Sequence, residues 1–316
     1  MKILVAGLGA LGTVYSCLLS GAGHEVYGLA KENSCEIINN NGVKVLGLWG
    51  EHHAFLKKTV SDPSLLNGID WDMVIVTVKS YQNADVLPKL KDLIQEHTYL
   101  CLLQNGYGNY ELASQYVSKK NIIMGRVIFG AETLATAVSK VTVCADDVML
   151  GSPENLIPMD NLEKIAALFA RASIPTKATD RIMEFVRAKI INNSALNPLG
   201  ALFEVPYGEL AANVYTKNIM DGIIEEIFTL LKKMGQKTLW PDKESYYEVF
   251  YDQLIPVTAA HRASMLQDIK RGRQTEIEAL NGAIAGLAKQ YGTHAPINEF
   301  LTKIIKAKES LRLDKI

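Results

Sequence analysis

Short apolar runs alternate with helix-like patterns over the first half of the chain. Five of these runs have the apolar or β-branched character of parallel strands, and segments between them, such as 84–97, have the periodicity of crossover helices. The runs cover residues 3–6, 25–29, 73–78, 99–103 and 122–129. This alternation predicts an α/β fold built on a doubly wound sheet.

The pattern changes after residue 130. Residues 131–144 and 148–150 predict antiparallel strands, 161–172 predicts a helix, and a last strand is expected near 175–178. Helical periodicity then dominates over 181–202, 208–235, 244–268, 276–290 and 297–310. We therefore expect two domains, an α/β domain at 1–180 and an all-helical domain at 181–316, with the active site in a cleft between them.

The first predicted strand runs directly into Gly7-x-Gly9-x-x-Gly12. Gly7 allows a tight turn out of the strand, Gly9 lets a phosphate approach the backbone, and Gly12 lets the next helix pack close to the sheet. The pyrophosphate of a dinucleotide would lie on free N–H groups at the positive end of that helix, around Ala10 and Leu11. The first domain is therefore predicted to be Rossmann-like.

A signal peptide or a short membrane span is the alternative for this stretch, because residues 3–23 carry no charge. Only Lys2 precedes the run as a basic residue, and five of its residues are glycine, which disfavours both alternatives. The net charge of −1 offers no basic field for nucleic acid or an anionic membrane. We expect a cytoplasmic protein that binds neither.

Composition adds two expectations. With 316 residues and 48% hydrophobic content, the chain can form two cores. The cysteines and the six histidines are scattered without metal-ligand spacing, so we expect reduced thiols, no disulfide and no metal site. The four cysteines are Cys17, Cys35, Cys101 and Cys144.

The end of the second strand bears on the choice of nicotinamide cofactor. An NAD site usually places an acidic residue there for the ribose hydroxyls, whereas a 2′-phosphate needs a cation. Lys31 lies at this place and Glu32 follows it. Lys31 favours NADPH/NADP⁺, although Glu32 leaves ribose recognition open and a solvated loop lysine is the alternative.

Two further groups of polar residues lie in the helical half. Lys189, Asn193 and Asn197 are spaced by four and share one helix face, which suggests a ligand site rather than a solvated face, since asparagine is a mediocre helix former. Thr275 and Glu278 have capping-box spacing, which predicts a helix with Glu276 in its first turn. A break at Gly272 would let Ser264 and Glu276 face one cleft, although an acid in a first turn is also stabilising by itself.

Taken together, these residues resemble the ketopantoate reductase (2-dehydropantoate 2-reductase) family over essentially the whole chain. Four separated motifs occur in the family's order. They are Gly7-x-Gly9-Ala-Leu-Gly12; Val78-Lys79-Ser-Tyr-Gln82 with Gln104-Asn105-Gly106; Lys189-x3-Asn193-x3-Asn197-Pro198; and Ser264-Met-Leu-Gln-Asp268 leading to Thr275-Glu276-Ile277. The resemblance implies reduction of ketopantoate to (R)-pantoate with NADPH, a step toward coenzyme A.

The resemblance also implies roles for single residues. Lys189 matches the family's catalytic lysine, Glu276 its catalytic glutamate, and Lys31 its basic position for the 2′-phosphate. His261 stands where a well-known form of the motif has a substrate-contacting asparagine, which leaves the substrate's identity open. The family's substrate-contacting positions correspond to Asn105, Asn193, Asn197 and Ser264. Its cofactor-contacting positions correspond to Lys79, Gln82 and Asn105.

The chemistry of the residues agrees with a reductase. Hydride delivery to a ketone develops negative charge on the carbonyl oxygen, and Lys189 can stabilise and protonate that oxygen while Glu276 orients the substrate. One alternative is a reductase of another branched 2-oxo acid, and another is a non-catalytic NADP(H)-sensing protein, which would have no use for this pair. A homodimer is a further expectation.

Overall fold

A computed structural model describes residues 1–313, and contacts within it divide the chain into two compact units. One unit comprises Met1–Gln104 and Asn109–Ile182, and the other comprises Asn105–Gly108 and the chain from Met183. The short segment Asn105–Gly108, which lies within the predicted N-terminal domain in sequence, groups with the helical unit by its contacts. The reason is close packing of this segment against the turn at Ala279, described below.

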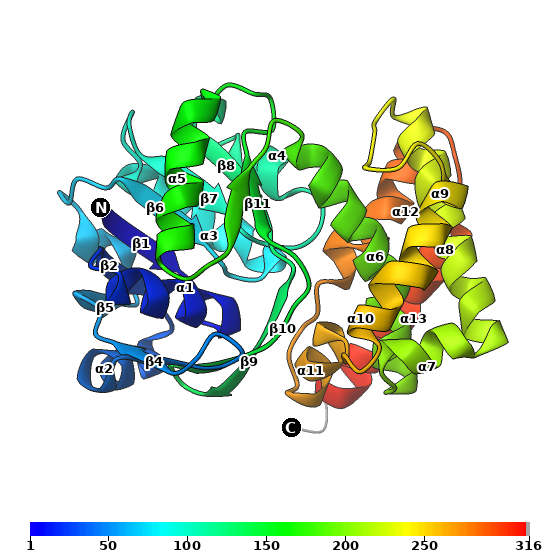
Figure 1. The fold of residues 1–316 in the computed structure, drawn as a ribbon, viewed down its shortest axis with the longest axis horizontal. Coiled ribbons are helices and arrows are strands. Elements are labelled where there is room, and N and C mark those ends of the chain that lie inside the picture. The colour runs from blue at the N-terminus through cyan, green and yellow to red at the C-terminus, as the bar shows by residue number, and fades with distance from the viewer. Residues whose placement is uncertain (314–316) are drawn as a thin grey trace. The chain divides into compact units, whose positions relative to one another are not determined.

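The α/β unit is built on an eight-stranded sheet whose central strands are parallel (Figure 1). The strand order is β12-β11-β8-β7-β6-β1-β2-β5, and only the β11–β8 pair is antiparallel. This confirms the predicted doubly wound sheet. The strands are β1 (Lys2–Ala6), β2 (Glu25–Leu29), β5 (Lys58–Val60), β6 (Met73–Val76), β7 (Tyr99–Leu102), β8 (Ile122–Arg126), β11 (Val148–Gly151) and β12 (Thr176–Ala178).

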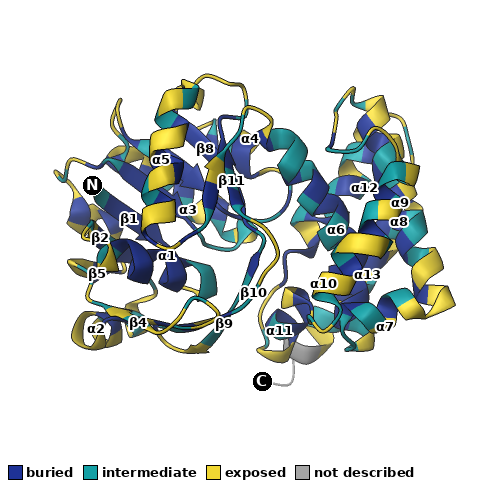
Figure 2. Ribbon diagram, in the orientation of Figure 1, coloured by how far each residue is buried: buried dark blue, intermediate teal, exposed yellow. Residues whose placement is uncertain are grey.

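Helices cover both faces of this sheet (Figure 1). Helices α1 (Ala10–Gly21) and α5 (Met159–Arg171) contribute Tyr15 and Phe169 to a core shared with inward-facing strand residues such as Val5 and Ile75. Figure 2 shows β1 and β8 buried and the outer face of α5 exposed. The other helices of the unit are α2 (Glu32–Asn41), α3 (Asn83–Leu90) and α4 (Asn109–Ala113).

A second, four-stranded sheet packs on the outer side of α1; the antiparallel strands predicted over 131–144 form two of its strands, whereas the other two were not predicted. Its strand order is β4-β3-β10-β9, and β3 and β10 are parallel although Lys44 pairs with Val138 across almost a hundred residues. The run 122–129 was expected to be one strand, but β8 ends at Arg126, and Phe129 is the first residue of β9 in the second sheet. The strands are β3 (Val43–Gly47), β4 (His52–Ala54), β9 (Phe129–Ala135) and β10 (Val138–Cys144).

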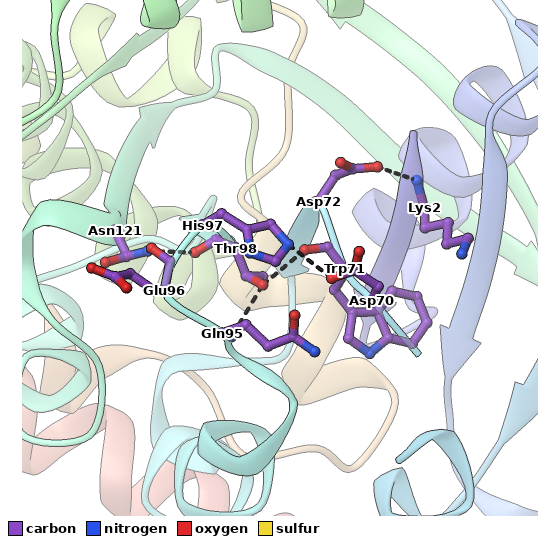
Figure 3. A network of polar contacts seen from close by, with 9 residues as sticks. All are labelled: Lys2, Asp70, Trp71, Asp72, Gln95, Glu96, His97, Thr98 and Asn121. Atoms are coloured by element: carbon purple, nitrogen blue, oxygen red, sulfur yellow. Dashed lines mark hydrogen bonds and ion pairs between the residues drawn. The ribbon is translucent and has the colours of Figure 1, made fainter. Parts of the chain in front are cut away.

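Polar contacts join the loops at the amino ends of the parallel strands (Figure 3). The Asp72 carboxylate accepts a hydrogen bond from the Lys2 backbone N–H at 2.7 Å, and Thr98 Oγ1 donates to the Trp71 carbonyl at 2.7 Å. Asn121 Nδ2 donates to the Thr98 carbonyl at 2.9 Å. These contacts stabilise the edge opposite the glycine loop, which leaves the carboxyl edge for a ligand.

The second unit is helical, as predicted, but its helices are more broken than the periodicity suggested. The run 208–235 is interrupted at Asn213, whose side chain accepts hydrogen bonds from Tyr215 N at 3.0 Å and Thr216 N at 3.2 Å and so begins a new helix. The run 244–268 also divides, because it includes a five-residue π-helical stretch at Phe250–Leu254 and an irregular stretch before Ser264. The helices are α6 (Ile182–Phe203), α7 (Tyr207–Ala212), α8 (Val214–Lys233), α9 (Lys243–Val249), α10 (Ile255–Thr258), α11 (Ser264–Lys270), α12 (Asn281–Gln290) and α13 (Pro296–Leu313).

The helix predicted to begin at Thr275 begins instead at Asn281, after a 3₁₀ turn at Ile277–Ala279. The capping box is not formed, because the Thr275 N–H donates to Glu309 Oε1 at 2.7 Å and Glu278 forms an ion pair with Lys306. Tertiary partners on α13 thus replace the local ones. Among the described helices, none is both long and apolar enough to cross a membrane.

Candidate active site

The glycine loop has the close packing that its spacing predicted. Gly7 has φ of +99°, and a Cβ on Gly12 would lie 1.9 Å from the Gly7 carbonyl oxygen, so only glycine lets α1 begin this close to β1. A Cβ on Gly9 would meet nothing within 4 Å. The backbone at Gly9 is therefore open on the side from which a phosphate would approach.

The amino end of α1 suits an anion. No side chain caps this end, and the first turn at Ala10 and Leu11 carries no acidic residue. Its first N–H groups and the helix dipole therefore present positive charge at the carboxyl edge of the sheet. The loop after β6 borders this place, since Thr77 Oγ1 donates to the Gly7 carbonyl at 2.6 Å. The chain order of the strands reverses between β1 and β6, which is where doubly wound sheets bind dinucleotides.

Lys31 and Glu32 lie at the carboxyl end of β2, and both are exposed. Lys31 is the residue before α2, and Glu32 is the first residue of that helix. The side chains of this pair carry opposite charges at neighbouring positions, so this end of β2 offers a cation for a 2′-phosphate and a carboxylate for ribose hydroxyls.

Lys79 lies in the loop after β6, where Gln82 stabilises its turn. Gln82 Oε1 accepts a hydrogen bond from the Lys79 backbone N–H at 3.1 Å. Below this turn is a buried amide cluster that sequence reasoning missed. Gln104 Nε2 donates to the Val78 carbonyl at 2.8 Å and to Asn83 Oδ1 at 2.6 Å. The cluster ties the loop carrying Lys79 to the end of β7.

In the helical unit, α6 carries Lys189, Asn193 and Asn197, as predicted. Lys189 and Asn193 are half-buried, whereas Asn197 is buried and its Oδ1 accepts a hydrogen bond from the Tyr207 hydroxyl at 2.7 Å. Burial raises the pKa of Tyr207, so this hydroxyl stays a donor at neutral pH. Tyr207 thereby fixes the side chain of Asn197 and was not among the expected site residues.

Glu276 and Asn105 are brought together from distant parts of the sequence. Asn105 Nδ2 lies 3.4 Å from Glu276 Oε2, and Glu276 is buried, with 8% of the residue exposed. The segment is anchored by a second contact, in which the Tyr107 backbone N–H donates to the Ala279 carbonyl at 2.8 Å. Gly106 has φ of +90°, and a Cβ there would lie 2.6 Å from the Ala279 carbonyl oxygen. Glycine thus permits the approach that places Asn105 beside the glutamate.

His261 and Ser264 lie around the start of α11. The His261 ring packs edge-on against the Tyr207 ring at 5.4 Å between centroids, and the His261 carbonyl accepts from Tyr207 N at 3.1 Å. His261 therefore joins the group of Tyr207 and Asn197. Ser264 is exposed as the first residue of α11. The break expected between Ser264 and Glu276 is observed, because α11 ends at Lys270, two residues before Gly272.

The glycine loop of the α/β unit and the polar side chains of the helical unit suit different ligands. The glycine loop and the uncapped helix end of the α/β unit fit a dinucleotide. The helical unit offers one ammonium, one carboxylate and several amides, which suit a small polar acid. No three His, Cys, Asp or Glu side chains gather as a metal site within the part of the chain that is described.

Similarity to known proteins extends over nearly the whole chain. Residues 3–155 match the ketopantoate reductase PanE/ApbA family and residues 166–309 match the ketopantoate reductase PanE/ApbA C-terminal family. A 2-dehydropantoate 2-reductase of Aquifex aeolicus is 44% identical over 313 residues, 99% of this chain and 98% of that protein. A 2-dehydropantoate 2-reductase of Pyrococcus horikoshii is 32% identical over 98% of both chains.

Solved structures agree. A PanE/ApbA family ketopantoate reductase from Ralstonia eutropha superposes with a TM-score of 0.87 at 25% identity, covering 99% of both chains. A D-mandelate dehydrogenase in a ternary structure with NADH and anilino(oxo)acetate superposes with a TM-score of 0.88 at 25% identity, again over 99% of both chains. With both family matches and a relative of 44% identity across its length, the chain belongs to the ketopantoate reductase family.

Proposed function

We propose that this protein reduces 2-dehydropantoate to (R)-pantoate with NADPH, a step of pantothenate biosynthesis. The observation that carries this proposal is the 44% identity to a 2-dehydropantoate 2-reductase over 99% of the chain. Following NADPH oxidation at 340 nm with 2-dehydropantoate tests it, with NADH as the parallel cofactor. Absence of turnover with purified, folded protein would refute it.

Lys189 is the proposed proton donor. Bound NADPH supplies a hydride to the substrate's 2-oxo carbon, and negative charge then develops on the carbonyl oxygen. An ammonium hydrogen-bonded to that oxygen stabilises the charge and delivers the proton that completes the alcohol. Lys189 is a half-buried lysine on the face of α6 that also carries Asn193, so it can combine a charge with a fixed position.

Glu276 is the proposed orienting carboxylate. It accepts a hydrogen bond from the substrate's hydroxyl group, while Asn105 supports its Oε2 from the protein side at 3.4 Å. The low exposure of this carboxylate keeps competing water away and strengthens each hydrogen bond that it accepts. Contacts to the substrate's carboxylate, and further contacts to its hydroxyl, are assigned to Asn105, Asn193, Asn197 and Ser264.

The α/β unit is the proposed nucleotide-binding domain, and the helical unit the proposed substrate-binding domain. Gly7, Gly9 and Gly12 with the N–H groups around Ala10 and Leu11 would hold the pyrophosphate. The other contacts toward the cofactor are assigned to Lys31 for the 2′-phosphate, and to Lys79, Gln82 and Asn105 nearer the nicotinamide.

A reductase of another branched 2-oxo acid is the second candidate. Two observations favour it: His261 packs on Tyr207 beside Asn197, and the D-mandelate dehydrogenase structure superposes with a TM-score of 0.88. Comparing kcat/KM for 2-dehydropantoate with that for phenylglyoxylate and 2-oxoisovalerate separates the two. A higher kcat/KM for either of the other acids would assign the protein to the second candidate.

A non-catalytic NADP(H)-sensing protein is the weaker alternative. The buried Glu276 with its Asn105 contact has no purpose in a sensor, whereas a reductase needs an oriented carboxylate. For the protein in its cell we propose a cytoplasmic location, no nucleic-acid or membrane partner, and a homodimer. Light scattering coupled to size-exclusion chromatography tests the assembly, and a mass near 35 kDa would contradict a dimer.

A further inference from the structure

One backbone carbonyl of α6, that of Ser194, has no N–H donor within the helix. In an α-helix the carbonyl of residue i accepts from the N–H of residue i+4, and the residue four positions after Ser194 is Pro198, which has no N–H. Ser194 is 0% exposed, so water does not reach it. A buried carbonyl without a donor is costly, and a partner from another element is therefore required.

Asn281 supplies that partner. Its Nδ2 donates to the Ser194 carbonyl at 3.1 Å and, with its other hydrogen, to Asn298 Oδ1 at 2.9 Å. Both asparagines are 0% exposed. Asn281 is the first residue of α12 and follows Glu276 by five positions. The Ser194 carbonyl, which Pro198 cannot serve as a donor, thus accepts the hydrogen bond that joins α12 to α6.

A carboxylate determines which way the amides point. Glu226 on α8 accepts hydrogen bonds from the backbone N–H groups of Ile297 at 2.8 Å and Asn298 at 3.0 Å, and from Asn298 Nδ2 at 2.7 Å. An ionised carboxylate can only accept, so Asn298 must turn its NH₂ group to Glu226 and its oxygen to Asn281. Asn281 is then left presenting its own NH₂ group to Ser194.

The turn between Glu276 and Asn281 is short and internally bonded. The Glu276 carbonyl accepts from Ala279 N at 3.1 Å and Leu280 N at 3.2 Å. The same turn receives Tyr107 N at Ala279. A restraint applied at Asn281 is therefore transmitted to the backbone of Glu276 within one compact turn.

We propose that Asn281 is a positioning residue for the reduction, holding the turn that carries Glu276 in register with the face of α6 that carries Lys189 and Asn193. Ser194, which accepts this hydrogen bond, directly follows Asn193 in the sequence. The bond therefore sets the distance between the start of α12 and this part of α6. The proposal rests on the proposed roles of Lys189 and Glu276. Proline at 198 has a specific part in it, because it makes the Ser194 carbonyl available.

The first test is Asn281→Leu, which keeps the branched shape of the side chain and removes both donors. We expect kcat/KM for 2-dehydropantoate to fall by tenfold or more, while the Kd for NADPH changes less than twofold. The matched control is Ile284→Ala, a buried apolar truncation on the same helix outside the amide chain. Unchanged kinetics in Asn281→Leu, or an equal loss in Ile284→Ala, would overturn the proposal.

The second test separates positioning from stability. Pro198→Ala restores an N–H for the Ser194 carbonyl, so the double variant Asn281→Leu/Pro198→Ala should recover melting temperature relative to Asn281→Leu. Its kcat/KM should stay low, because the link between α12 and α6 is still missing. Recovery of both together would reduce Asn281 to a stabilising role. The double variant also serves if Asn281→Leu alone does not fold.

A third readout needs no substrate. Hydrogen exchange of the backbone at residues 276–280 should be faster in the double variant than in Pro198→Ala alone, because the turn has lost its anchor. Equal exchange in the two would contradict the proposal. If the wild-type protein does not reduce 2-dehydropantoate, the proposed function fails, and the exchange result still decides whether Asn281 restrains the turn.

Discussion

Lys31 and Glu32 are neighbours at the end of β2, and both side chains are exposed. Their charges favour opposite cofactors, since a cation suits the 2′-phosphate of NADPH and a carboxylate suits the ribose hydroxyls of NADH. We therefore propose that cofactor preference depends on this residue pair, which substitution can test.

Replacing Lys31 with Ala should weaken NADPH binding by tenfold or more and leave NADH nearly unchanged. A charge-assisted contact contributes ~1.5–3 kcal/mol, and only NADPH offers the phosphate that would make it. Fluorescence titration with both cofactors measures the effect. Glu32→Ala is the control, and if it weakens the binding of one cofactor, that cofactor should be NADH. Equal losses for the two cofactors in Lys31→Ala would refute the assignment.

Replacing Lys189 with Ala should lower kcat by roughly 10²–10⁴, the usual contribution of a general acid, with NADPH affinity largely kept. Steady-state kinetics and a separate NADPH titration measure the two quantities. Arg187→Ala is the control, because it removes a cation from the same helix, where Arg187 donates instead to Gln236 Oε1 at 2.9 Å and so lies outside the proposed site. Normal turnover by Lys189→Ala would remove this residue from the mechanism.

At the scale of elements, helix α1 depends on its contact with the end of β1. The Gly12 position has no room for a side chain, and the same helix ends in Gly21, where an added Cβ would meet nothing within 4 Å. The two glycines thus give a matched pair within one helix.

Replacing Gly12 with Ala should abolish NADPH binding, because the Cβ would force the amino end of α1 away from Gly7. Replacing Gly21 with Ala should keep NADPH binding and leave stability equal or higher, since alanine favours a helix over glycine by about 0.5–1 kcal/mol. Calorimetric titration and thermal unfolding measure both variants. Normal NADPH affinity in Gly12→Ala would show that the loop can shift without loss.

Helices and strands were predicted correctly where their pattern depends on neighbouring residues. They were predicted wrongly or missed where they depend on partners from distant parts of the chain. Strands β1, β2, β6, β7 and β8 followed from apolar runs and α6 followed from its periodicity, whereas the short parallel strand β5 was not predicted. The helix expected from Thr275 failed, because Glu309 on α13 takes the N–H that the capping box would have used. Strands β3 and β4 were missed because pairing of β3 with β10 and of β4 with β3, rather than their own residue pattern, makes them strands.

In the molecule as a whole, the proposed cofactor contacts other than Asn105 belong to the α/β unit, and the proposed substrate contacts belong to the helical unit. The glycine loop and Lys79 lie in the α/β unit, and Lys189 and Glu276 lie in the helical unit, which also includes Asn105. Because hydride transfer requires the nicotinamide beside the 2-oxo carbon, we expect the nucleotide to complete the substrate site.

Binding should therefore be ordered, with 2-dehydropantoate binding the NADP⁺ complex far more tightly than the free protein. Calorimetric titration of 2-dehydropantoate with and without saturating NADP⁺ measures the difference. In Gly12→Ala, NADP⁺ should give no such enhancement, because the nucleotide does not bind. The same substrate affinity in the presence and absence of NADP⁺ for the wild-type protein would show that the site is complete without the nucleotide.

Local spacing was enough to predict the strands of the doubly wound sheet, the glycine loop and the polar face of α6, since each of these depends on residues within a few positions of one another. Packing of distant elements, in contrast, places Asn105 beside Glu276, gives Asn197 its hydrogen bond from Tyr207, and lets Asn281 donate to the Ser194 carbonyl, which Pro198 cannot serve as a donor. The physical reason is that turns and helical faces are encoded by local spacing. The partner of a buried polar group is selected only when distant elements pack together.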